Sequence, residues 1–390
     1  MIRTGDIKWW LIEAKRHPEA APEIIEALAA RLVELDGENE RLRAEILQLE
    51  REGAGGADIR QVSALRQQVE RLQSLLESQG AGEPAALLIS QPLHAARVPL
   101  SALRLAVEPG VEMAQRFFRS GALLRLALLL LARPHDELLL LTSRGRALTM
   151  LPADVSAVSG ADGQATLTPI EGRLQQGEWL TGGAAVGRPP RFWTVVTQRG
   201  FVRQYLRAAF ERDASQGGRV IESPIARDVP VAIVDGDEGD LLLCTRWGRV
   251  ARFPQRTIEA QGSLALELEP DDEVVSALSL PAEREIVFVT MAGLAVRRAT
   301  AQFEARTRPG GEGRAAIQAF DVLGAFPYDG GSALVLATYS GRLVALPLAH
   351  LPLQERLGHG SPLADFARDP AAAAALAPGV YAQVYLAAEG

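Results

Sequence analysis

A hairpin-like pattern of apolar and polar positions recurs along the chain. "LLLLTSRGRALTM", residues 138–150, is an apolar run, a threonine, a short polar turn, a glycine and a second strand-like run. The same Thr-x-x-Gly skeleton returns four more times, at spacings of 55, 48, 45 and 48 residues, ending at Gly200, Gly248, Gly293 and Gly341. A degraded copy at 85–100 has Ser90 in place of the threonine and Leu93 in place of the glycine. The sequence therefore predicts six units of roughly fifty residues, a spacing typical of propeller blades.

The residue types within one unit indicate its structure. The run before each threonine is apolar at nearly every position, which predicts a strand covered on both faces, as by neighbouring blades. The glycine suits a turn position with positive φ, and the threonine hydroxyl can bond the turn backbone. Another strand-like run precedes the hairpins, for example "EVVSALSL" before "PAERE". Each unit is thus expected to hold about four short strands.

The two ends of this array predict a closed ring. A linear stack would leave an apolar face exposed at each end. The last segment, "GVYAQVYLA" at 379–387, resembles the strand that precedes each hairpin, yet no hairpin follows it. The first copy has a hairpin but no preceding strand. We therefore expect 379–387 to pair with 85–91, which would close the ring and leave only short edges.

The first eighty residues carry a different, heptad period. Apolar residues alternate at steps of three and four, with leucine at every d position and one asparagine among the a positions: Ile25, Leu28, Leu32, Leu35, Asn39, Leu42, Ile46 and Leu49. A lone Asn at a favours a parallel, in-register dimer, because it pairs with its mate across the seam. A second heptad follows the helix-breaking "REGAGGAD", so a monomeric helical hairpin is the alternative. The expected organisation is a coiled coil at 1–78, a linker at 79–84 and a six-bladed, mostly β domain at 85–390.

Composition narrows the function classes. The net charge of −7 gives no overall attraction to nucleic acid, so such a partner must be argued from local patches. The single cysteine, Cys244, excludes an internal disulfide and lies in the apolar run "DLLLCT", which indicates a buried, inert thiol. The N-terminus shows no export signal and the most apolar stretch, 121–142, is interrupted by charges, so no membrane partner and a cytoplasmic location are expected.

Motifs for catalysis or cofactor binding are not found. The five histidines lack metal-ligand spacing, and there is no phosphate-binding Walker loop and no EF-hand pattern. Neither a metal site nor a cofactor is therefore expected.

The repeats resemble a known family. "EVVSALSLPAEREIVFVTMAGLAVRRAT" and "DLLLCTRWGRVARFP" are similar to the repeats in the C-terminal domain of the DNA gyrase A subunit or of its topoisomerase IV counterpart. The resemblance covers about 85–388. It implies a six-bladed β-pinwheel whose blades exchange strands, with duplex DNA wrapped around a basic rim.

Three departures from that family bear on function. The catalytic core and its Arg-Tyr motif are absent, and Tyr205 lies in a repeat strand, where it is expected to be a packing residue. The family's Gly-rich box has no good match, and the nearest stretch, "RTRPGGEGR" at 306–314, departs from it at Pro309 and Glu312. Residues 81–390 carry 30 Arg against 33 Asp and Glu, so the rim is not uniformly basic.

Arginines nevertheless gather beside the hairpin turns. Thirteen are candidate DNA-contacting residues: Arg144, Arg146, Arg199, Arg203, Arg246, Arg249, Arg252, Arg297, Arg298, Arg306, Arg308, Arg314 and Arg342. Acidic residues gather in other turns, at 235–240, 269–273 and 281–285. If these two sets of turns lie on different parts of the blade, one surface is basic and another acidic. The alternative is a solvated surface on which arginines pair with the acids.

The expectation is a non-enzymatic, dimeric, sequence-independent DNA-binding or DNA-wrapping protein. It would act as a topoisomerase accessory or a nucleoid factor, with duplex DNA, itself through the coiled coil, and a topoisomerase or other protein as partners. The alternative is a protein-interaction scaffold on a β-propeller that has lost DNA binding, as the negative charge and the altered box would suggest.

Overall fold

The computed structural model describes residues 82–91, 93–106, 114–158, 160–170, 173–281 and 283–386 of the chain. The expected coiled coil, with its heptad residues Ile25 to Leu49, lies outside these described residues, so the parallel dimer stays a prediction.

The described chain is mostly β and forms six small sheets, five of four strands and one of three. Each sheet, here called a blade, is built on one of the expected hairpins. In chain order, blades 1 to 6 hold the hairpins β1 (Ala85–Ser90) with β2 (His94–Pro99), β5 (Glu137–Thr142) with β6 (Ala147–Met150), β9 (Phe192–Thr197) with β10 (Phe201–Leu206), β12 (Asp240–Thr245) with β13 (Arg249–Pro254), β16 (Glu285–Thr290) with β17 (Leu294–Ala299), and β20 (Ala333–Thr338) with β21 (Arg342–Pro347). The first hairpin strands are buried almost throughout, as expected for strands covered on both faces.

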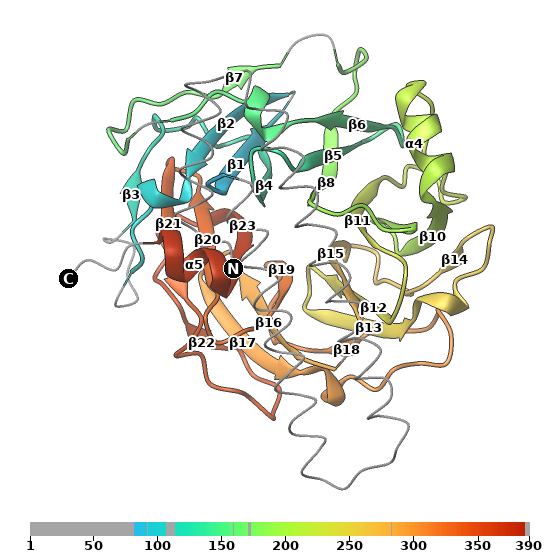
Figure 1. The fold of residues 1–390 in the computed structure, drawn as a ribbon. Coiled ribbons are helices and arrows are strands. Elements are labelled where there is room, and N and C mark those ends of the chain that lie inside the picture. Colours follow the sequence, from blue (N-terminus) through green and yellow to red (C-terminus); the bar gives the residue numbers. More distant parts are fainter. Residues whose placement is uncertain are drawn as a thin grey trace, which may run out of the picture. The chain divides into compact units, whose positions relative to one another are not determined.

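An inner strand flanks the first strand of every hairpin. The six inner strands are β4 (Leu126–Ala132), β8 (Leu180–Val186), β11 (Pro230–Asp235), β15 (Val274–Leu280), β19 (Val322–Pro327) and β23 (Ala371–Ala377). Each contacts the next in this order, and β23 contacts β4, so the blades close into a six-bladed ring (Figure 1).

A short outer strand flanks the second hairpin strand in five blades, and it comes from beyond the next hairpin. The outer strands are β3 (Gln115–Arg116), β7 (Thr168–Pro169), β14 (Ser263–Leu264), β18 (Arg314–Ala315) and β22 (Ser361–Pro362). Strand β7, for example, follows the hairpin of blade 2 but pairs with β2 of blade 1. In the same way β3 follows the first hairpin and pairs with β21 of blade 6, which ties the two ends of the ring together. The blades therefore exchange strands, as the resemblance implied.

The expected pairing of 379–387 with 85–91 is wrong. Strand β1 pairs with β2 and β4, and the described part of that C-terminal segment is helix α5 (Gly379–Tyr385). The strand that precedes a hairpin completes the previous blade, so β23 belongs to blade 6 and no strand is left over among the described residues. The buried residues Ala382 and Leu386 stand four apart, which is the spacing of a helix face.

Blade 3 departs from the other blades at its outer edge. The other α-helix of the described chain, α4 (Arg207–Ser215), follows β10 directly and buries Phe210 against Trp193, with ring centroids 6.2 Å apart. Single-turn 3₁₀ helices hold the corresponding place in blades 1, 2, 4 and 5, at Leu100–Ala102, Pro152–Asp154, Gln255–Thr257 and Thr300–Gln302.

The threonine and the glycine of each turn have separate roles. All five threonines are buried, and each hydroxyl oxygen accepts the backbone N–H four residues later, as from Arg249 to Thr245 at 3.2 Å. The glycine has φ of +69 to +92° and donates its N–H to the threonine carbonyl. Its own carbonyl accepts an N–H from the exchanged segment, as from Ala316 to Gly248 at 2.7 Å. The exchanged segment is thus docked on the turn glycine.

The close approach of that segment also explains why the residue is glycine. A Cβ on Gly248 would lie 2.6 Å from the carbonyl oxygen of Ile317, and the other four turn glycines meet a backbone oxygen of the exchanged segment at 2.2–2.7 Å.

We expect Gly248→Ala to destabilise the ring far more than Gly177→Ala, its matched control. Gly177 has nearly the same φ, +71°, but nothing lies within 4 Å of its added Cβ. The control variant should lose about 1 kcal/mol in the free energy of unfolding, because alanine adopts positive φ less readily than glycine. Gly248→Ala must also displace the exchanged segment, so about 3 kcal/mol is expected in urea titrations. Equal losses would show that the docking contact carries no stability.

Candidate nucleic-acid interface

The turns of the blades lie at two ends. The hairpin turns lie at one end of the ring. This follows from the position of the inner strands, since the inner strand of each blade begins beside the hairpin turn of the preceding blade. Val274 N donates to Gln198 O at 2.9 Å, and Val322 N donates to Arg246 O at 3.0 Å. We call this the threonine-turn end. The connections from inner strand to hairpin, such as 235–240 and 281–285, lie at the other end, here the acid-turn end.

The separation of basic and acidic turns is incomplete. The acidic segment 269–273 precedes the inner strand β15 and therefore lies at the threonine-turn end. It was expected to lie apart from the arginines of the hairpin turns, but it is next to them. Asp272 is buried there and accepts the N–H of Trp247 at 3.0 Å, while Glu273 forms an ion pair with Arg246.

Carboxylates support the hairpin turns at this end. Buried Glu178 accepts the hydroxyl of Thr142 at 2.5 Å, and Asp369 accepts both the hydroxyl of Thr338 and the N–H of Ser340. A carboxylate that accepts two hydrogen bonds from a turn stabilises it. These acids therefore serve the fold, a role that the charge pattern alone did not indicate.

Two of the thirteen candidate arginines are buried. Arg252 forms an ion pair with Asp240 at 2.7 Å and donates to Thr300 O at 3.1 Å. Arg298 donates to Ala316 O at 3.1 Å, and burial lowers the pKa of its guanidinium. A buried guanidinium in such contacts reaches no phosphate without rearrangement, so these two are poorly placed to contact DNA.

Six more are engaged in contacts within or between blades. Arg146 pairs with buried Glu178, and Arg297 pairs with Glu285 while lying 3.6 Å from the ring centroid of Tyr328. Arg203 lies over the ring of Tyr205. The others donate to backbone carbonyls, and these are Arg199, Arg249 and Arg306. Such arginines hold loops together but keep their charge when the partner is a neutral carbonyl.

The remaining five are open to solvent to different degrees. Arg144, Arg246, Arg308 and Arg314 are exposed, and Arg342 is half-buried. Arg246 and Arg314 are neutralised by Glu273 and Glu304. Arg144 donates only to the neutral Gln175 and Gln176, and the guanidinium groups of Arg308 and Arg342 have no hydrogen bond or ion pair with a described residue.

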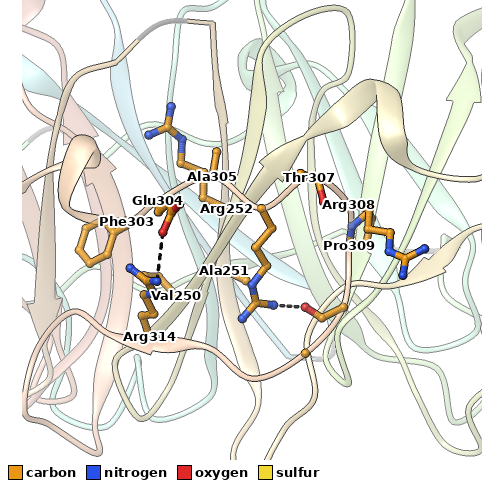
Figure 2. Close-up of a pocket in the computed structure, with 13 residues that line it drawn as sticks. Val250, Ala251, Arg252, Phe303, Glu304, Ala305, Thr307, Arg308, Pro309 and Arg314 are labelled. Atoms are coloured by element: carbon orange, nitrogen blue, oxygen red, sulfur yellow. Dashed lines mark hydrogen bonds and ion pairs between the residues drawn. The ribbon is translucent and has the colours of Figure 1, made fainter.

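The Gly-rich loop 306–314 borders a cavity of about 710 Å³ on the outer edge of blade 4. The Arg306 side chain closes the loop by donating to Gly310 O and Glu312 O. Figure 2 shows Arg308 on one side of this cavity, and Arg314, bonded to Glu304, on the other. The loop therefore presents two arginines on a closed backbone frame.

Two outer-edge arginines were not predicted from the sequence. Arg116 lies on the exchanged strand β3, directly opposite Arg342 of β21, and Arg219 forms a β-bridge with Arg146. Like charges placed opposite each other across strands are destabilising, but Arg219 pairs with Glu222 at 3.2 Å and Arg146 pairs with Glu178. The Arg116 guanidinium has no hydrogen bond or ion pair with a described residue, so this charge is uncompensated there. Only the strand exchange brings these residues together, and no local sequence pattern signals it.

The other candidate residues are packing groups. Tyr205 lies edge-on to Phe210, at 6.3 Å between centroids, and burial raises the pKa of its phenol. Cys244 is fully buried in β12, and burial raises the pKa of its thiol. Among the described residues, no group of histidine, cysteine and acidic side chains could hold a metal ion, and no helix is long and apolar enough to cross a bilayer.

We expect Cys244 to resist alkylation in the native protein and to react at once in urea, because only the thiolate is nucleophilic and burial suppresses it. Mass spectrometry after iodoacetamide treatment at pH 8 measures this. Labelling of the native chain at the rate of a free thiol would contradict the buried position.

Comparisons with known proteins bear on the fold of the chain. No protein-family model matches the chain. The DNA gyrase A subunit of Escherichia coli (strain K12) is 26% identical over 263 residues, 62% of this chain and 29% of that protein. The DNA gyrase A subunit of Haloquadratum walsbyi is 25% identical over 196 residues, 46% of this chain and 22% of that protein. The chain thus spans less than a third of the length of these curated relatives.

Solved structures show the same fold. A DNA gyrase A C-terminal domain superposes with a TM-score of 0.61 at 14% identity, covering 75% of this chain and 99% of that one. The C-terminal domain of DNA topoisomerase IV gives a TM-score of 0.51 at 17% identity, covering 76% and 93%. The chain is therefore homologous to part of the DNA gyrase A protein, and its ring has the β-pinwheel fold of the gyrase A and topoisomerase IV C-terminal domains.

Proposed function

We propose that the ring binds duplex DNA along its outer edge without reading base sequence, and that it bends or wraps the duplex. Homology to DNA gyrase A and the shared pinwheel fold support a role in DNA topology. Arginines that contact phosphates bind any sequence, since phosphates carry no base identity.

The Arg116–Arg342 pair carries this proposal. The exchanged strand β3 places two arginines opposite each other at the outer edge, and neither guanidinium has a hydrogen bond or ion pair with a described residue. Repulsion between the two arginines destabilises the free protein, and a polyanion lying across them relieves that repulsion. Arg144 in blade 2 and Arg308 beside blade 4 would extend the contact round the ring.

The chain is proposed to act without catalysis of its own. Its match to gyrase A covers 29% of that protein, and the pinwheel likeness is to the C-terminal domain. The chain would act in the cytoplasm as a topoisomerase accessory or nucleoid factor. Two rings joined by the expected coiled coil would then hold two duplex segments. Tethering raises the effective concentration of the second contact.

A protein-interaction scaffold is the second candidate, and one observation favours it. Phe320 is 75% exposed and lies edge-on to Trp247 at the threonine-turn end, with ring centroids 5.6 Å apart. Exposed aromatic pairs are enriched where proteins bind each other. This surface and the outer edge can function side by side.

We expect the double variant Arg116→Ala with Arg342→Ala to bind linear duplex more weakly than the unaltered chain. Loss of two phosphate contacts should flatten the slope of log K against log salt by about 2, as measured by gel retardation over a salt series. Its melting temperature should be unchanged or higher, because a repulsive pair is removed.

The control is Arg284→Ala, an exposed arginine in an acid turn of blade 5. It should leave both DNA affinity and salt slope unchanged. If the double variant binds DNA like the control, the outer edge is not the interface. If instead it melts at a lower temperature, the two arginines serve the fold.

A further inference from the structure

Blade 3 differs from the other blades at the acid-turn end. The connections from inner strand to hairpin elsewhere contain acids, as in "RPHDE" at 133–137, "DGDEGD" at 235–240 and "PYDGGS" at 327–332. In blade 3 the connection is "GRPPR" at 187–191, with two arginines, two prolines and no acid. The reversal of charge is confined to this turn.

Helix α4 adds a third arginine to the same place. Arg207, its first residue, donates its backbone N–H to Arg191 O at 2.9 Å, so the helix start is fixed against the turn. The turn 187–191, the start of α4 and the end of β11 border a cavity of about 580 Å³, which is lined by Arg188, Arg191 and Arg207. That volume is within the range of ligand pockets in proteins.

The carboxylates that line the cavity accept hydrogen bonds from backbone N–H groups. Both carboxylate oxygens of Asp237 accept backbone N–H groups, from Arg191 at 2.9 Å and from Phe192 at 2.6 Å. Asp235 accepts the N–H of Asp237 at 2.8 Å. These contacts hold the basic turn in one conformation, so little ordering is needed on binding.

The three guanidinium groups form few or weak contacts with the described residues. Arg188 is exposed, and its side chain has no hydrogen bond or ion pair with a described residue. Arg191 lies 5.3 Å from the ring centroid of its own neighbour Phe192. Arg207 meets Glu211 at 3.6 Å in a solvent-exposed pair, which contributes little. All three are therefore available to carboxylates, which arginine binds in a bidentate manner.

Apolar surface accompanies this charge. Leu206 is 49% exposed at the mouth of the cavity, and Pro189 is exposed beside it. A duplex backbone gains nothing from such an apolar surface. A peptide with acidic and apolar residues suits both features.

We propose that this cavity docks a short acidic peptide segment of a partner protein. Its carboxylates would pair with Arg188, Arg191 and Arg207, and one apolar side chain would lie against Leu206 and Pro189. This site is separate from the proposed DNA-binding edge, because it uses the acid-turn end of blade 3.

The test is fluorescence anisotropy of the full chain with a labelled short peptide of glutamate, aspartate and leucine. We expect saturable binding that Arg188→Glu weakens about tenfold, since it replaces an attractive pair by a repulsive one. Leu206→Ser should weaken it about threefold. Replacing leucine by serine in the peptide should have a similar effect.

The matched control is Arg284→Glu, which reverses an exposed arginine in the acid turn of blade 5 and should leave peptide affinity unchanged. Thermal melts of each variant check that the ring is intact. Absence of peptide binding, or equal loss in both charge-reversal variants, would overturn the proposal. A labelled short duplex is the second probe. If Arg188→Glu weakens the duplex and spares the peptide, the cavity is a phosphate site and the proposal is wrong.

Discussion

The whole ring depends on the docking of an exchanged strand against a turn glycine. In five turns the glycine carbonyl accepts an N–H from a segment that belongs, along the chain, to the next unit. The contact is possible only because no Cβ stands between the two backbones. Since each blade is completed by its neighbour, a blade is not an independent unit, and the ring is closed by the same contact through β3 and Gly341.

The same exchange sets the charge of the outer edge. The outermost strands are the exchanged ones, so a few residues on them decide what the ring presents to a partner. Arg116 and Arg219 come from these segments and face arginines of the host blade. Inward from that edge, arginines such as Arg252 and Arg297 are bound by acids of their own hairpins. Structural and exposed arginines thus coexist in one repeat, which is how a chain with a net charge of −7 can still carry local positive sites.

The repeat could be predicted from sequence because its signals are local. An apolar run, a threonine and a glycine at fixed spacing describe a hairpin, and the structure has all six. Strand exchange could not be predicted from residue patterns alone, since "EVVSALSL" looks the same whether it pairs with the hairpin before it or after it. The wrong pairing for 379–387 arose from this ambiguity and from taking helix α5 for a strand, whereas the inner strand of blade 6 is β23. The candidate arginines show the same limit, because burial of Arg252 and Arg298, and the placing of Arg116 opposite Arg342, depend on contacts between distant segments.

A plasmid topology assay tests the central claim most directly. Relaxed circular DNA is incubated with the full chain, treated with a nicking-closing topoisomerase, freed of protein and separated on a gel, at low and at physiological salt. A chiral path of duplex around the ring predicts a change in linking number that shrinks as salt rises. An unchanged linking number at both salts, together with no retardation of linear duplex at low salt, would contradict DNA binding by this ring.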